Sequence, residues 1–425
     1  MARPKITSVR GVKDILPVEA RRWQRVEALA RETFARYGYS EIRVPVFERT
    51  ELFARSIGEE TDIVNKEMYT FGDKGGESLT LRPEATASIC RAYVQHALYN
   101  QAGAAKLFCI GPMFRYERPQ AGRLRQFHQI DAEVFGSLDP AVDAEVIVML
   151  TDFLSAAGLQ DLSLQLNNLG DAQCRPAYAR ALREFLRKEA KGLGEEVEAR
   201  VERNPMRFLD SKDPDHQAVI ARAPAIGQFW NEACRRHLDA VCGYLKGAGV
   251  RFEVNPRLVR GLDYYCLTVF EVTSSRLGAQ NAVCGGGRYD GLVEALGGPP
   301  TPGIGFAVGM ERLLQLVAEG EKAEAPPAAL DAYLVPLGER AAEEAFALAG
   351  ELRRGGLRVD LSFGGGSMKS QLRRADSSGA PVVLILGDQE IARGVVNLKY
   401  MRESRSEEVP RAEVFDKLQK IFKDN

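Results

Sequence analysis

The chain has 425 residues, of which 45% are hydrophobic, so it is long enough to bury substantial cores and to form two or three domains. Its 57 lysines and arginines nearly balance its 58 aspartates and glutamates. This balance excludes a general electrostatic attraction to nucleic acid, and any RNA binding has to come from local patches.

Cysteine usage and the N-terminus indicate a cellular compartment. The seven cysteines are odd in number, scattered and never spaced as C-x-x-C, which argues for reduced thiols and against a zinc site or a disulfide framework. The N-terminal residues MARPKITSVRGVKDIL contain no apolar signal-peptide core. No apolar run approaches the ~18 residues of a membrane-spanning helix. We therefore expect a soluble, cytoplasmic protein that does not associate with a membrane.

The first predicted elements are a long helix and a strand. Apolar residues spaced three or four apart predict an amphipathic helix over 17–38, and Gly38 is placed to end it. The segment EIRVPVFE at 41–48 is predicted to be a strand, in which Pro45 implies an edge or a bulge.

A strand and a helix are expected next. Residues 78–82 alternate between polar and apolar side chains, as a half-buried strand does. Pro83 and Glu84 suit the first turn of a helix that runs to about Leu98. On this reading Glu84 can be a favourable first-turn acid, or it can belong to a site.

Residues 114–136 combine two strand-like segments with an arginine-rich loop. Arg115 and Glu117 share one face of the first segment, because side chains repeat every second residue in a strand. Three acceptors share one face of the returning segment: Gln129, Asp131 and Glu133. Guanidinium groups fit phosphates bidentately, so such a hairpin can hold a nucleotide together with an amino-bearing substrate. Spacing alone equally allows a solvated hairpin without a site.

The rest of the chain divides into three stretches. Residues 167–249 are charged and predicted to be helical, and strands are expected again from Arg251, within LTVFEV, NAVCGGG and GIGFAVG. The segment EGEKAEAPPAA at 319–329 is typical of a linker. Beyond it, alternating strands and helices predict a separate α/β domain. His128 lies on the strand face opposite Gln129, which favours packing over catalysis.

Five segments spread over nearly the whole chain carry a family resemblance. The segment at 114–136, FRYERPQAGRLRQFHQIDAEVFG, is similar to motif 2 of class II aminoacyl-tRNA synthetases. Its sequence most resembles that of the histidyl-tRNA synthetases. LRPEATA at 81–87 is a class-wide signal, whereas VRGLDYY at 259–265 and GGGRYDGL at 285–292 are specific to the histidyl branch. GIGFAVGMERL at 303–313 resembles motif 3.

The resemblance implies an α+β fold. It predicts a class II antiparallel catalytic sheet flanked by helices over residues 1–325, with an inserted helical module at about 170–250, and an anticodon-binding α/β domain at 330–425. The segment around Pro45 resembles motif 1, the dimer-forming element, so a homodimer is expected.

The resemblance also assigns roles residue by residue. Arg115 and Arg260 are the expected catalytic residues at the α-phosphate of ATP, and Asp263 could alternatively hold Arg260 in a structural pair. The glycines of 303–309 are expected to leave room for the adenine ring. The expected histidine-binding residues are Glu84, Thr86, Arg115, Gln129, Glu133, Arg260, Tyr264, Tyr265 and Tyr289. The expected ATP-binding residues are Arg115, Glu117, Arg123 and Arg312. The expected tRNA-binding residues are Arg118, Gln120, Lys369, Arg373 and Arg374.

These assignments predict a histidine–tRNA ligase. It would activate L-histidine with ATP, supplied as its magnesium complex, to histidyl-adenylate and pyrophosphate, and then transfer histidine to the 3′ end of tRNA(His). No tightly bound, protein-ligated metal is expected. One alternative is the non-catalytic paralogue that regulates ATP phosphoribosyltransferase, which typically lacks intact RGLDYY and GGRYDGL motifs and the C-terminal domain. Another is a class II synthetase for a different amino acid.

Overall fold

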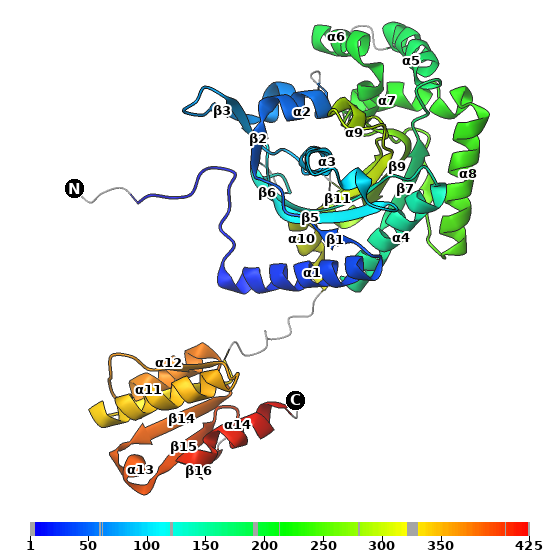
Figure 1. Cartoon of the computed structure of the whole chain (residues 1–425). Helices are drawn as coiled ribbons and strands as arrows, with labels where there is room; N and C mark the ends of the chain where they lie inside the picture. The colour runs from blue at the N-terminus through cyan, green and yellow to red at the C-terminus, as the bar shows by residue number, and fades with distance from the viewer. Residues whose placement is uncertain are drawn as a thin grey trace. The chain divides into compact units, whose positions relative to one another are not determined.

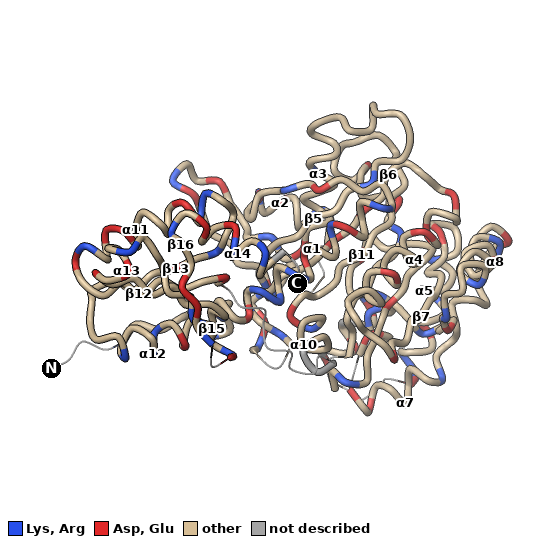
Figure 2. Tube along the Cα trace, turned by 90° about the horizontal axis from the view of Figure 1, so that it is seen from below, with Lys and Arg blue, Asp and Glu red and all other residues tan. Residues whose placement is uncertain are grey.

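The computed structural model describes residues 5–58, 61, 63–119, 122–189, 194–211, 213–278, 281–320, 330–403 and 405–423. The chain forms two compact units, Met1–Glu321 and Lys322–Asn425 (Figure 1). Lysines and arginines alternate with aspartates and glutamates along both units (Figure 2), as the nearly balanced composition predicts. No helix within the described ranges is both long and apolar enough to cross a membrane.

An eight-stranded sheet of the order β1-β5-β6-β11-β10-β9-β7-β8 organises the described part of the first unit. Its long central strands pair antiparallel, and only the short edge strands β1 and β8 pair in parallel. The predicted antiparallel sheet of an α+β fold is therefore confirmed. The strands are β1 (Ser40–Glu41), β5 (Ala105–Phe114), β6 (Gln126–Phe135), β7 (Ser163–Asn168), β8 (Glu253–Val254), β9 (Cys266–Thr273), β10 (Ala282–Arg288) and β11 (Gly303–Gly309).

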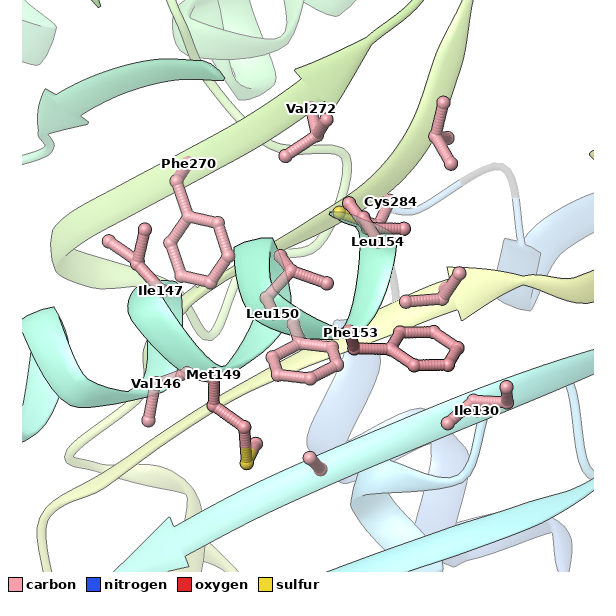
Figure 3. Packing of buried hydrophobic residues seen from close by; sticks show 14 of the residues in the cluster. Ile130, Val146, Ile147, Met149, Leu150, Phe153, Leu154, Phe270, Val272 and Cys284 are labelled. Carbon is pink, nitrogen blue, oxygen red and sulfur yellow. The ribbon is translucent and has the colours of Figure 1, made fainter. Parts of the chain in front are cut away.

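Four long helices cover one face of this sheet and bury its largest core. They are α1 (Pro17–Arg36), α4 (Pro140–Ala156), α8 (Glu232–Gly247) and α10 (Met310–Gly320). Figure 3 shows Leu150 and Phe153 of α4 packed over Ile130 and Phe270 of the strands. Helix α1 follows the predicted apolar spacing, because Trp23, Val26, Ala30 and Phe34 are its buried residues. Because these helices cover one face of the sheet, a ligand can reach only the opposite face.

The opposite face carries shorter elements around a second core and a smaller cluster that includes the buried residues of α2. They include α2 (Thr50–Ile57), α3 (Thr86–Gln95), α9 (Leu292–Ala295) and a small sheet of β2 (Phe47–Arg49), β4 (Ser78–Leu81) and β3 (Tyr69–Gly72). The charged stretch predicted to be helical contains α5 (Arg175–Glu189), α6 (Glu195–Arg203), α7 (Pro214–Arg222) and α8.

Two predictions near the N-terminus were wrong in detail. The single strand expected at 41–48 is two short strands in different sheets, because β1 pairs with β5 whereas β2 pairs with β4. Pro45 lies between them and has no N–H to donate to either sheet. The carbonyl of the preceding residue, Val44, accepts a hydrogen bond from the Arg82 guanidinium at 3.0 Å.

The helix expected from Pro83 to about Leu98 is shorter at both ends. It begins at Thr86, and the Glu84 carboxylate accepts the N–H groups of Thr86 and Ala87 at 2.8 Å each. It ends at Gln95, because Ala97 adopts a left-handed conformation with φ 50°.

The second unit is built on a mixed sheet of the order β13-β12-β14-β15-β16 within the described residues. The strands β13, β12 and β14 are parallel, and the hairpin of β15 and β16 continues the sheet antiparallel. The predicted α/β character is present, but strand β16 was not predicted from the sequence. The elements are β12 (Ala332–Leu337), α11 (Glu339–Arg354), β13 (Val359–Leu361), α12 (Met368–Ser378), β14 (Val382–Gly387), α13 (Asp388–Arg393), β15 (Val395–Tyr400), β16 (Arg405–Pro410) and α14 (Val414–Lys423).

Candidate active site

A cavity of about 260 Å³ lies on the sheet of the first unit. Strands β6, β10 and β11 form its floor, and the segments before α3 and before β9 form its walls. Every residue expected to bind histidine or ATP lines this one cavity: Glu84, Thr86, Arg115, Glu117, Arg123, Gln129, Glu133, Arg260, Tyr264, Tyr265, Tyr289 and Arg312.

One end of the cavity is a buried network centred on Glu133. Its carboxylate accepts the hydroxyl of Thr86 at 2.6 Å and the hydroxyl of Tyr289. Burial raises the pKa of Glu133 well above its ordinary value, although the hydrogen bonds from Thr86 and Tyr289 lower it. The carboxylate is held in one orientation by two donors from elements far apart in sequence, which is what preorganised recognition of a ring nitrogen requires.

Two tyrosines close the same end. The rings of Tyr264 and Tyr265 lie 4.6 Å apart, and Tyr264 also contacts Tyr289 at 5.6 Å. Burial raises the pKa of Tyr265 to about 12 and that of Tyr264 well above its ordinary value. Both hydroxyls therefore stay protonated at neutral pH and can donate a hydrogen bond to a ligand.

The two predicted catalytic arginines are each held by a protein oxygen. Arg115 donates from Nε to the Pro83 carbonyl at 2.8 Å, which leaves its two terminal nitrogens for a ligand. Arg260 donates from Nη1 to Glu271 at 2.6 Å. The alternative pairing of Arg260 with Asp263 was wrong, because the Asp263 carboxylate accepts from Arg207 at 3.0 Å.

A second group of cations lies at the other end of the cavity. Arg312 donates to the carbonyls of Gly122 and Ala282 at 3.1 and 2.8 Å. Arg123 forms an ion pair with Glu117 at 3.2 Å. Burial lowers the pKa of Arg312, and the positive charges of Arg123 and Arg115 lower it further. Two arginines thus lie together here with Glu117 as the carboxylate paired to Arg123, and Arg312 donates to backbone carbonyls, an arrangement that suits the binding of phosphates.

The glycine-rich strands make room for these side chains, and this corrects the expectation that the glycines of 303–309 receive an adenine ring. A Cβ at Gly305 would overlap the Glu133 carboxylate, and one at Gly303 would overlap the Tyr289 ring. Within GGGRYDGL, a Cβ at Gly285 would overlap the Arg260 guanidinium. At these three glycines a side chain of the protein occupies the space, so the expectation was wrong for Gly303 and Gly305. Gly309 also lines the cavity, and a Cβ there would meet no atom closer than 3.9 Å, so the adenine role stays a prediction at that position.

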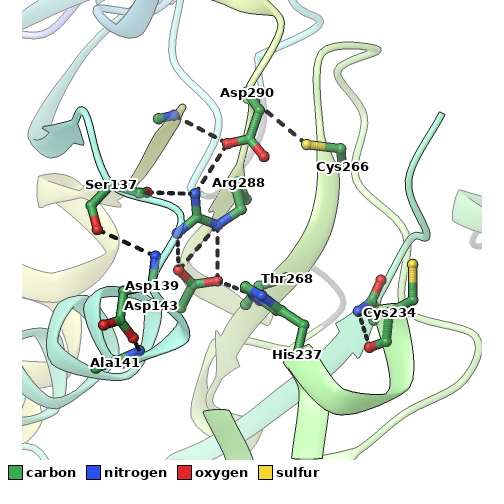
Figure 4. A network of polar contacts seen from close by, with 12 residues as sticks. Ser137, Asp139, Ala141, Asp143, Cys234, His237, Cys266, Thr268, Arg288 and Asp290 are labelled. Atoms are coloured by element: carbon green, nitrogen blue, oxygen red, sulfur yellow. Dashed lines mark hydrogen bonds and ion pairs between the residues drawn. The ribbon is translucent and has the colours of Figure 1, made fainter. Parts of the chain in front are cut away.

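Behind the cavity a buried ion-pair network ties β10 to α4 and α8 (Figure 4). The Arg288 guanidinium donates to Asp143, and it also donates to the Ser137 carbonyl at 2.9 Å. Asp143 Oδ2, which accepts from Arg288 Nε at 3.1 Å, also lies 2.8 Å from His237 Nε2. The sequence assigned no function to Arg288. The available signal was its position next to Tyr289, because neighbouring residues of an extended segment point to opposite faces and Tyr289 lines the cavity.

The expected tRNA-binding residues lie outside the cavity. Arg118 is exposed on the loop after β5, and Gln120 lies outside the described residues. In the second unit, Lys369, Arg373 and Arg374 are exposed on α12. Arg374 donates to the carbonyls of Phe363 and Gly365, so its side chain holds the preceding loop.

Two cysteines that are distant in sequence meet a carboxylate. The Sγ atoms of Cys174 and Cys234 are 3.8 Å apart, and Asp171 lies beside them. The Asp171 carboxylate accepts from the Cys174 N–H at 2.9 Å and from Asn231 at 2.8 Å. These groups are therefore engaged in joining the N-termini of α5 and α8.

Comparisons with known proteins show the family of the chain. A model of the histidyl-tRNA synthetase family matches residues 11–313, and a model of an anticodon-binding domain matches residues 331–421. The chain is 52% identical to a histidine–tRNA ligase of Desulfosudis oleivorans, with 96% of each chain covered. It is 51% identical to a histidine–tRNA ligase of Maridesulfovibrio salexigens, with 97% of this chain and 99% of the relative covered.

Solved structures show the same likeness. The apo histidyl-tRNA synthetase of Staphylococcus aureus is 36% identical, with a TM-score of 0.83, over 98% of this chain and all of that one. A Bacillus halodurans protein described as an ATP phosphoribosyltransferase regulatory subunit/histidyl-tRNA synthetase shares the fold at a TM-score of 0.66 and 23% identity, over 91% of this chain and 99% of that one. The family models and the sequence matches over nearly the whole length place this chain in the histidyl-tRNA synthetase family, and it is an aminoacyl-tRNA ligase.

Proposed function

We propose that the chain activates L-histidine with ATP to give histidyl-adenylate and pyrophosphate, and then transfers histidine to the 3′ end of tRNA(His). One observation carries the proposal. The same cavity combines a carboxylate and tyrosines suited to an imidazole at one end with arginines suited to phosphates at the other.

In this proposal the two catalytic arginines act on the α-phosphate. Attack of the histidine carboxylate on that phosphorus displaces pyrophosphate, and negative charge builds on the phosphoryl oxygens. Arg115 and Arg260 supply fixed positive charge from two sides of the cavity, and an arginine needs no proton transfer to do so. ATP arrives as its magnesium complex, and Arg123 and Arg312 bind its outer phosphates and the adenine end together with Glu117.

Specificity for histidine comes from the network at Glu133. A carboxylate with fixed orientation accepts the imidazole N–H, and a tyrosine hydroxyl donates to the other ring nitrogen. Glu84, Thr86 and Gln129 line the side that receives the amino group. A site built from buried polar groups rejects amino acids that leave them unpaired.

Pyrophosphate exchange with each amino acid in turn tests the proposal. Exchange that depends on histidine alone supports it. A non-catalytic regulator gives no exchange with any amino acid, and a synthetase of another specificity exchanges with a different one.

The second unit is proposed to bind the anticodon loop through an aromatic groove. The groove has a volume of about 720 Å³ and lies at the carboxyl ends of β12 and β13. Phe346 and Phe363 line it and are 64% and 65% exposed, which suits stacking with unpaired bases. The buried Ser362 hydroxyl and Gln371 Oε1 have no hydrogen-bond partner among the described residues, so a base edge can bond to them. The basic face of Lys369 and Arg373 would bind phosphates beside the groove.

Substitution of the groove aromatic tests this placement. Phe363→Ala should raise the KM for tRNA about tenfold, since stacking on one base contributes ~1–3 kcal/mol, and leave histidine-dependent exchange unchanged. Tyr244→Ala removes an exposed aromatic side chain of the first unit and serves as the control. An unchanged KM for tRNA in Phe363→Ala would move the anticodon contact elsewhere.

The chain is further proposed to act as a cytoplasmic homodimer. Exposed apolar side chains gather in the segment that resembles motif 1 and in the residues around α1, including Leu16, Val18, Val46 and Phe47. Light scattering of the purified chain tests the dimer, and cell fractionation tests the location.

A further inference from the structure

The predicted catalytic residue Arg260 lies in a loop and not in the sheet that forms the cavity floor. This segment, residues 259–265, lies between β8 and β9 and forms no helix or strand, and we call it the Arg260 loop. It also carries Tyr264 and Tyr265, and all three residues line the cavity. The placement of their side chains therefore depends on what fixes the loop.

The Arg260 guanidinium depends closely on the position of its own backbone. Its Nη1 atom donates to Glu271 at 2.6 Å, whereas its buried Nε atom has no hydrogen-bond partner among the described residues. The guanidinium lies in a narrow space, because a Cβ at Gly285 would overlap it. Displacement of a catalytic group by about 1 Å can lower a rate about 100-fold, so a small shift of the loop would impair the reaction.

Asp263 connects the Arg260 loop to the inserted helical module. Its Oδ1 atom accepts hydrogen bonds from Asn204 Nδ2 and Arg207 Nη2, at 3.0 Å each. Asn204 precedes the short helix Pro205–Asp210 of the module, and Arg207 lies within that helix. Arg207 also makes a long hydrogen bond of 3.5 Å to the Gly261 carbonyl of the loop. We call the two contacts of the Asp263 carboxylate the Asp263 clamp.

The segment that follows α2 leaves room for the same carboxylate. A Cβ at Gly58 would come within 2.6 Å of Asp263 Oδ2, and the φ of 100° at Gly58 favours glycine as well. The Asp263 N–H donates to the Ile57 carbonyl at 3.4 Å. Asp263 thus contacts both the inserted module and the end of α2.

Apolar packing joins the module and the loop too, but it does not orient them. Phe208 and Leu209 of the helix Pro205–Asp210 are buried in the same apolar cluster as Val259 of the loop. Apolar contacts are non-directional, whereas hydrogen bonds weaken steeply when their geometry changes. The Asp263 clamp is therefore the part of this contact that can set the orientation of the loop.

We propose that Asp263 is a positioning residue for the activation step, because the Asp263 clamp holds the Arg260 loop where Arg260 meets the α-phosphate. Asp263 is not one of the described residues that line the cavity, so it acts through Arg260 and not on a substrate. The proposal rests on the histidine activation proposed above, to which it adds the inserted module as a support of the chemistry. In the competing role Asp263 only stabilises the fold.

The test measures whether the effect of Asp263 passes through Arg260. Pyrophosphate exchange is compared for the wild-type chain, Asp263→Ala, Arg260→Ala and the variant with both changes. Circular dichroism fixes a temperature at which all four chains are folded. Histidine-dependent exchange by the wild-type chain is established first. The control is Asp239→Ala, which removes an exposed carboxylate from α8.

Asp263→Ala should lower the kcat of exchange about tenfold, the effect of one lost hydrogen bond to a charged group. The KM for ATP should stay within about twofold, because the lost placement concerns the transition state. In the Arg260→Ala background the same change should lower kcat less than twofold, because the guanidinium that it positions is already missing.

Equal losses of kcat in both backgrounds, or no loss in either, would overturn the positioning role while histidine activation by the wild-type chain still stood. Absence of wild-type exchange would overturn both proposals. Arg207→Ala removes a donor of the Asp263 clamp and should give the same pattern, so it replaces Asp263→Ala if that variant does not fold. Asp239→Ala should match the wild type throughout.

Discussion

Arg260 is positioned in advance for the negative charge of a phosphate. Its guanidinium donates to the Glu271 carboxylate at 2.6 Å. Gly285 on the neighbouring strand leaves the space in which the guanidinium lies. A side chain held in this way loses little conformational freedom when a phosphate arrives, which favours a role in the transition state.

Arg260→Ala should lower the rate of histidine-dependent pyrophosphate exchange by ~10²–10³, because one preorganised charge is removed. Its melting temperature should stay within a few degrees of the wild-type value. Exchange kinetics and calorimetry measure the two effects, with the exposed Arg251→Ala as the control. Near-normal exchange would remove Arg260 from the mechanism.

Glu133→Gln should weaken the binding of histidine and leave the binding of ATP unchanged. An amide keeps the shape of the carboxylate but presents an NH₂ group where Thr86 or Tyr289 now donates. We expect the KM for histidine to rise about 10- to 100-fold, the range of a lost hydrogen bond to a charged group. Steady-state exchange at varied histidine and varied ATP measures both constants. An equal rise in the KM for ATP would give Glu133 a general supporting role instead.

At the scale of elements, the fold joins helices to strands through buried polar contacts as well as through the apolar core. Arg288 of β10 and Asp143 of α4 are both fully buried and form an ion pair. The contact anchors the last residue of β10 (Figure 4), and the next residue, Tyr289, lines the cavity. A buried pair contributes little compared with apolar packing, but removing one partner leaves the other charge uncompensated.

Asp143→Asn should therefore lower the free energy of unfolding by ~3–5 kcal/mol at pH 7. Hydrogen bonds from His237 and Arg288 lower the pKa of Asp143 against the opposing effect of burial. The carboxylate thus stabilises the fold above the ordinary pKa of about 4, and this contribution is lost as the pH falls through the lowered value. Urea unfolding at pH 7 and at about pH 3 should show the gap between variant and wild type narrowing in acid.

The exposed Glu294→Gln is the matched control for this measurement, and it should unfold like the wild type at both pH values. If Asp143→Asn and the wild type had the same free energy of unfolding at pH 7, the network would not hold β10 to α4.

At the scale of the whole molecule, activation and tRNA recognition are assigned to different units. All the residues proposed to bind ATP or histidine belong to the first compact unit. The match to an anticodon-binding domain covers residues 331–421 of the second.

A chain ending near Gly320 should retain histidine-dependent pyrophosphate exchange and lose most aminoacylation. The loss should grow as salt is raised, because the remaining contacts are mainly to phosphates. Exchange and charging assays are compared with the mass of the truncated chain in solution, since the second unit could also support the dimer. A folded, dimeric truncation that charges tRNA as well as the full chain would contradict the assignment.

The sequence by itself determined the kinds of element and the family. The spacing of apolar residues predicted α1, the three acceptors on one strand face predicted β6, and alternating strands and helices predicted the C-terminal α/β domain. The five motifs predicted the family and its antiparallel α+β domain. The strand expected to carry Arg115 and Glu117 was wrong in its position, because β5 ends at Phe114 and these two residues follow it. The twelve residues that the motifs suggested for histidine and ATP do line one cavity, and their individual roles are predictions for the experiments above. Local periodicity and short motifs carry this information because each depends on residues close together in the chain.

Only the tertiary structure decided which side chains meet. Arg260 pairs with Glu271 and not with its near neighbour Asp263, and the glycines of β10 and β11 clear space for side chains from other segments. Arg288 meets Asp143 across 145 residues. Such contacts depend on register and packing between distant segments, which no local pattern encodes.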